Sequence, residues 1–120
     1  MYFLDKGQPV AVVTGESPTT PEEAVRILLR GPEELLEDRG LTTALSPVKP
    51  LSVESRRGGT VTIRLPAFVK LPSRLGLDQL VCTAAAAEVI AEPDVPSVTV
   101  VVSASESWRY TGRGSDCPAN

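Results

Sequence analysis

Residues Leu75–Ala91, with the sequence LGLDQLVCTAAAAEVIA, decide how this 120-residue chain folds. The stretch is rich in strong helix formers and contains no proline, so it predicts a helix. Pro93 follows shortly after Ala91 and ends the helix there. We expect this helix to pack against a β-sheet that the rest of the chain supplies.

The apolar residues of this helix recur at helical spacing and indicate one buried face. They are Leu77, Leu80, Val81, Ala84, Val89 and Ile90. Asp78, Gln79 and Glu88 are expected to stay in water. The run Ala84–Ala87 has almost no side-chain bulk, so the helix axis can come close to the surface that it covers.

Composition places the chain among globular domains with one core, because 42% of its residues are hydrophobic. The net charge of −3 leaves no basic footprint, so nucleic acid is not expected as a partner. No apolar run approaches the ~20 residues that a membrane span needs. The chain has no histidine, which excludes Ser-His-Asp and Cys-His nucleophiles and removes the commonest metal ligand.

Two patterns organise the first third of the chain. Apolar runs at Tyr2–Leu4 and Val10–Thr14, separated by turn residues, predict two short strands. Pro21–Arg30 predicts a helix, because Thr20 can cap its first turn and Gly31 can end it.

The remaining strands are indicated by alternation and by valine. Leu51–Arg56 and Thr60–Leu65 alternate on either side of Gly58-Gly59, which predicts a hairpin with one face toward the core and one toward water. The valine-dense run Ser97–Ala104 predicts a strand inside a sheet, and Glu106–Thr111 predicts a last strand.

Strands and helices mix without strict alternation, so the fold class is α+β. We expect a single domain over residues 1–120, built as a small mixed or antiparallel β-sheet with two helices packed on one face. Residues 111–120 are polar and are expected to form a C-terminal tail.

The two cysteines, Cys82 and Cys117, allow two interpretations. They are either unpaired, with Cys82 buried as a small hydrophobic residue, or joined in a disulfide that ties the tail to the long helix. A disulfide would imply an oxidising compartment outside the cytoplasm.

From the reactive side chains present, we predict no catalytic, cofactor-binding or metal-binding residue. Gly58-Gly59 is better explained as a turn than as a phosphate loop, and two cysteines alone cannot form a structural zinc site. The alternative is a small secreted hydrolase that acts on cell-wall carbohydrate through paired carboxylates, using acids such as Glu54 or Glu106.

A candidate partner surface lies on the water-facing side of the predicted hairpin. It comprises Glu54, Arg56, Thr62 and Arg64, together with Trp108 in the last strand. Trp108 is either an exposed anchor for a partner or a ring that packs in the core or at its edge.

Three stretches together resemble the GerMN domain, which is named for the sporulation and germination protein GerM. They are YFLDKGQPVAVV (2–13), TPEEAVRILLRGPEELLEDRGLTTALSP (20–47) and LSVESRRGGTVTIRLPAF (51–68). The most specific parts are the helix ending at Leu28–Pro32 and the loop Gly40–Pro47. Gln79–Thr83 and Cys117–Ala119 look like the actinobacterial branch of envelope lipoproteins in this family.

The resemblance implies a non-enzymatic binding or scaffolding module, with a fold similar to the ring-building modules of secretion machines. Such modules occur in extracytoplasmic proteins at the outer face of the cytoplasmic membrane, often in lipoproteins, and some are linked to sporulation. The implied partners are envelope proteins. No lipobox cysteine or leader occurs in the sequence, so membrane contact is expected only through a lipid anchor absent from this chain. The cysteine pair fits that extracytoplasmic setting as a Cys82–Cys117 disulfide.

Overall fold

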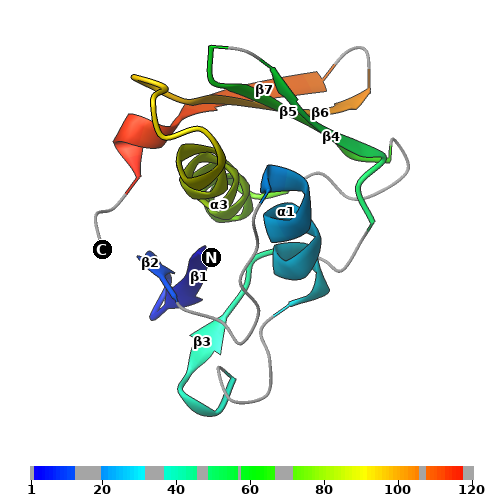
Figure 1. Cartoon of the computed structure of the whole chain (residues 1–120). Coiled ribbons are helices and arrows are strands. Elements are labelled where there is room, and N and C mark those ends of the chain that lie inside the picture. Colours follow the sequence, from blue (N-terminus) through cyan, green and yellow to red (C-terminus); the bar gives the residue numbers. More distant parts are fainter. Residues whose placement is uncertain are drawn as a thin grey trace.

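The computed structural model describes residues 2–12, 20–31, 37–45, 49–56, 58–66, 72–105 and 108–117. These residues form three layers: a four-stranded sheet, two helices beneath it, and a three-stranded sheet on the far side of the helices (Figure 1). The architecture confirms the predicted α+β class, with both helices on one face of a mixed sheet.

The four-stranded sheet has the order β4-β5-β6-β7. Its strands are β4 (Ser52–Arg56), β5 (Thr60–Arg64), β6 (Thr99–Ser105) and β7 (Trp108–Arg113). The predicted hairpin is confirmed as the antiparallel pair β4–β5, and β6–β7 is antiparallel as well. β5 and β6 are parallel, because the chain between them crosses over the sheet through the long helix.

Both helices have the boundaries that their end residues favour. In α1 (Pro21–Arg30) the Glu23 N–H donates to Thr20 Oγ1 at 3.2 Å, and Gly31 ends the helix with a φ of +94°. In α3 (Arg74–Ala91) the Gly76 N–H donates to the side chain of Ser73. α1 packs beside α3 and against β4, while α3 lies under β6 and β7.

The N-terminal strands form a second sheet, which the sequence does not indicate. It has the order β2-β1-β3 and consists of β1 (Tyr2–Asp5), β2 (Gln8–Ala11) and β3 (Leu41–Thr42). The predicted hairpin at this end of the chain is present as β1–β2, whereas β3 lies in a segment that reads as a loop. The sheet packs against α3 through β1 and β2.

α3 is therefore covered on several sides, and the burial predicted for four of its residues is wrong. Gln79 and Glu88 were expected in water, yet they are only 0% and 1% exposed. Val89 and Ile90 were expected in the core, yet they are 49% and 67% exposed. α3 is enclosed by two sheets and a second helix, so the middle of this helix has no side that faces water throughout. The last turn of α3 projects beyond those neighbours, which exposes its apolar side chains.

The C-terminal strand begins and ends two residues later than predicted. β7 continues to Arg113, and a 3₁₀ helix, η1 (Gly114–Asp116), follows it directly. Thr111 to Arg113 thus belong to the sheet rather than to the tail. Glu106 lies outside the described residues.

Candidate functional site

The outer face of the four-stranded sheet, turned away from the helices, is a regular surface built from all four strands. Strand alternation points Val61, Ile63, Val100 and Val102 toward the helices, where they are fully buried. The intervening side chains point outward. We call them the open sheet face: Ser52, Glu54, Arg56, Thr60, Thr62, Arg64, Thr99, Val101, Ser103, Arg109, Thr111 and Arg113.

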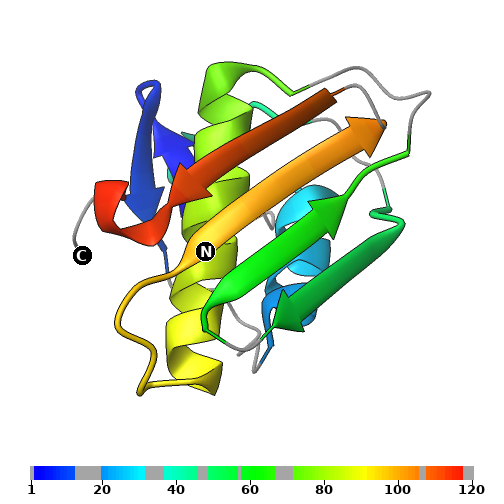
Figure 2. The same ribbon diagram turned by 90° about the horizontal axis from the view of Figure 1, so that it is seen from above.

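The strand registers arrange the open sheet face in three rows that cross all four strands. The first row is Arg56, Thr60, Thr99 and Arg113. The second row is Glu54, Thr62, Val101 and Thr111. The third row is Ser52, Arg64, Ser103 and Arg109. Two arginines stand in each outer row, and hydroxyl groups fill most of the space between them. In Figure 2 this face is turned toward the viewer, and no described helix or strand crosses it.

The charge of this face differs in sign from that of the whole chain. It holds four of the twelve basic residues and one of the fifteen acidic residues, in a chain whose net charge is −3. Glu54 lies 3.9 Å from the guanidinium of Arg56, and both side chains are more than half exposed. Within the described part of the chain, Arg64, Arg109 and Arg113 form no ion pair.

The structure brings together four of the five predicted surface residues and separates the fifth. Glu54, Arg56, Thr62 and Arg64 all lie on the open sheet face. Trp108 lies on the opposite side of the sheet, where it is half-buried and packs against the core. The sequence signal that could have located it is alternation: Trp108 shares a face with Tyr110, which pairs with the buried Val102. Arg109 and Arg113 are the charged members that the prediction missed.

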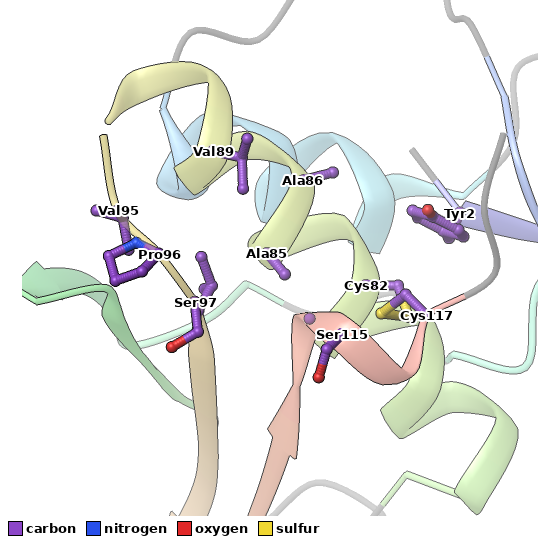
Figure 3. A pocket seen from close by; sticks show the side chains of 12 residues that line it. Tyr2, Cys82, Ala85, Ala86, Val89, Val95, Pro96, Ser97, Ser115 and Cys117 are labelled. Atoms are coloured by element: carbon purple, nitrogen blue, oxygen red, sulfur yellow. A yellow bond between two sulfur atoms is a disulfide. The ribbon is translucent and has the colours of Figure 1, made fainter. Parts of the chain in front are cut away.

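A second feature is a cavity of about 270 Å³ beside the Cys82–Cys117 disulfide, which joins α3 to the residue after η1. Figure 3 shows Ala85, Ala86 and Val89 of α3 on one side of this cavity and Val95 and Pro96 on another.

A cavity of about 220 Å³ lies across the same disulfide and is lined partly by Arg74, Asp78 and Tyr110. The Arg74 guanidinium lies 5.6 Å from the centre of the Tyr110 ring and 3.3 Å from the Asp78 carboxylate. These contacts hold the N-terminal turn of α3 against β7.

Comparison with protein families gives a match to the family Germane, described as sporulation and spore germination, over residues 1–102. The chain belongs to the Germane family. Comparisons with curated proteins and with solved structures found no match. The matched segment of this Germane domain ends inside β6, so Arg109, Arg113 and Cys117 lie beyond it. The open sheet face therefore combines arginines from inside and outside the family match.

The Germane domain buries one carboxylate that takes no part in either cavity. Glu88 is 1% exposed, and the hydroxyl of Ser55 donates to its Oε2. Among the described residues, its Oε1 has no hydrogen-bond partner. Of the two acids named in the hydrolase alternative, Glu54 is exposed on the open sheet face, and Glu106 lies outside the described residues.

The described residues hold no group of three or more cysteine, aspartate and glutamate side chains that could bind a metal ion. None of the helices within the described ranges is long and apolar enough to cross a membrane.

Proposed function

We propose that this Germane domain is a non-enzymatic binding module of the bacterial cell envelope, and that it holds its partner on the open sheet face. The observation that carries the proposal is a sheet face that no described helix or strand covers, with three arginines in regular rows that form no ion pair within the described residues. Unpaired, exposed guanidinium groups are well suited to binding carboxylates and phosphates. A sheet face with these groups stabilises the fold little, so their clustering favours a binding role.

The proposed location is extracytoplasmic, at the outer face of the cytoplasmic membrane, in a protein held there by a lipid anchor. The Cys82–Cys117 disulfide supports this location, because disulfides persist in oxidising compartments outside the cytoplasm. Protease treatment of intact spheroplasts that produce the full-length protein tests it. Degradation of the domain before lysis is expected, and protection until lysis would contradict an extracytoplasmic position.

The binding role is tested by capture from an envelope extract. The variant Arg56→Glu with Arg64→Glu reverses two charges on the open sheet face and is expected to lose most of the captured material. Its melting temperature should stay close to that of the wild type, since both side chains are exposed. The envelope proteins implied by the family resemblance are the partners to be identified in the captured fraction.

A matched control carries the same change of net charge away from the sheet. Arg39 and Lys49 are exposed and lie outside the strands of the four-stranded sheet. The variant Arg39→Glu with Lys49→Glu should capture as much as the wild type. Equal losses in both variants would indicate a nonspecific charge effect, and equal capture by all three proteins would exclude this surface.

A further inference from the structure

We infer that the open sheet face binds an anionic polymer in which polyol units are joined by phosphodiesters. The inference rests on the binding role proposed above and names the chemistry of the partner. It is drawn from the positions of four arginines, from the hydroxyl groups between them, and from the kinds of side chain that the described face lacks.

The arginines are spaced to contact several phosphates of one chain. Arg56 and Arg113 share a row and are three strands apart, which corresponds to about 14 Å between their backbones. Arg109 and Arg113 are four residues apart along β7, which corresponds to about 13 Å. Each guanidinium can donate two parallel hydrogen bonds to the two free oxygens of a phosphodiester. A linear polymer that crosses the face would therefore contact an arginine at each end of the crossing.

The surface between the arginines is lined by hydroxyl groups. Thr60 and Thr99 stand between Arg56 and Arg113, Ser103 stands between Arg64 and Arg109, and Thr62 and Thr111 lie in the middle row. A hydroxyl group both donates and accepts hydrogen bonds, which matches the hydroxyl and ether oxygens of a polyol. Short side chains also keep this floor flat, so that a thin polymer can lie in contact with it.

The composition of the face favours such a polymer over an acidic protein or a nucleic acid. Protein interfaces concentrate their binding energy in buried aromatic and aliphatic anchors, and single-stranded nucleic acids stack their bases on aromatic rings. The open sheet face contains no aromatic residue, and Val101, its one aliphatic residue, is half-buried.

Binding of purified poly(glycerol phosphate), measured by isothermal titration calorimetry, tests the inference on the intact protein. The wild type should bind, and the affinity should fall as salt is added, because the contacts are between exposed charges. Arg109→Gln with Arg113→Gln should weaken binding roughly tenfold, which is the loss of two exposed ion pairs. Arg39→Gln with Lys49→Gln removes the same charge elsewhere and should bind as the wild type does.

A second variant tests the contribution of the hydroxyl groups that lie between the arginines. Thr62→Val with Thr111→Val keeps the shape and strand preference of both side chains while removing two hydroxyl groups. It should weaken binding of poly(glycerol phosphate) several-fold and leave binding of inorganic polyphosphate, which has no polyol, unchanged. Equal affinity of the wild type and this variant for poly(glycerol phosphate) would overturn the assignment of a polyol.

Other outcomes separate this inference from the proposed function. Absence of poly(glycerol phosphate) binding, or binding that the Arg109 and Arg113 substitutions do not weaken, would overturn the inference. Tighter binding of duplex DNA than of poly(glycerol phosphate) would overturn it as well. If the inference fails while capture from extract still depends on Arg56 and Arg64 and yields an acidic protein, the binding module stands with a protein partner.

Discussion

The side-chain amide of Gln79 donates a hydrogen bond to the backbone carbonyl oxygen of Tyr2, 77 residues away in the chain, at 3.0 Å. The Oε1 of the same side chain accepts the N–H of Ala44 at 2.8 Å. Gln79 is fully buried, and its bond to Tyr2 is buried while its bond to Ala44 is part-buried. One side chain of α3 thus fixes β1 and the segment after β3, and joins the helix layer to the three-stranded sheet.

Gln79→Ala is expected to lower the free energy of unfolding by about 3 kcal/mol, because it removes the hydrogen bonds from this buried side chain to two backbone groups. Urea denaturation followed by circular dichroism measures the change. Gln8→Ala removes the other glutamine of the chain, which is exposed in β2, and should cost less than about 0.5 kcal/mol. Similar losses for the two variants would show that the bonds of Gln79 contribute nothing.

Gln79 also shows why the burial of α3 could not be predicted from the sequence. Periodicity assumes that a polar residue on a helix faces water, and this holds for a helix covered on one side. α3 is enclosed by α1 and both sheets, so polar side chains inside it must find partners in distant segments. Its partners are the carbonyl of Tyr2, the N–H of Ala44 and the hydroxyl of Thr43, and no short-range pattern in the sequence links them to Gln79.

From the sequence, only the half of the open sheet face that the β4–β5 hairpin forms could be predicted. Alternation in Leu51–Leu65 places Glu54, Arg56, Thr62 and Arg64 on one side, because a short turn sets the register of the hairpin. Arg109 and Arg113 join them only through the parallel pairing of β5 with β6 and the bulged pairing of β6 with β7. Neither register is determined by a short turn, so this half of the surface required the structure.

Glu88→Gln is expected to raise the free energy of unfolding at neutral pH by about 1 kcal/mol. The carboxylate is buried and Ser55 satisfies one of its oxygens, while the other has no partner. Replacing a buried charge with a neutral group of the same shape removes a desolvation cost. Urea denaturation measures the change, and Glu92→Gln, at an exposed position, is the control. A loss of stability with Glu88→Gln would show that the negative charge is needed.

Cys82→Ala with Cys117→Ala is expected to lower the free energy of unfolding by about 3–4 kcal/mol. The disulfide links residues 35 apart, and closing a loop of that length restricts the unfolded chain. Comparing the variant with the oxidised protein in urea measures the loss. Equal stability of the two proteins would contradict this account.

Alkylation without reductant tests the same disulfide chemically. In the folded protein neither cysteine should react, so the measured mass should not change. After unfolding and reduction both should react, which serves as the internal control. Labelling of both thiols in the unreduced, folded protein would refute the bridge.

Gly59→Ala is expected to destabilise the domain far more than Gly58→Ala, although both glycines have positive φ, +85° and +87°. A Cβ at Gly58 would meet no atom within 4 Å, so that substitution should cost only about 1–2 kcal/mol of backbone strain. A Cβ at Gly59 would lie 2.3 Å from the carbonyl oxygen of Ser97. The backbone would have to move, and the carbonyl of Gly59 also accepts the N–H of Thr99 at 2.8 Å, where β6 begins beside β5.

The free energies of unfolding of the two variants, measured by urea denaturation, should therefore differ by at least about 1–2 kcal/mol, the usual cost of overpacking against a rigid neighbour. Equal losses would mean that the segment before β6 yields readily, and that the close approach of Gly59 to Ser97 does not determine the start of the parallel pairing.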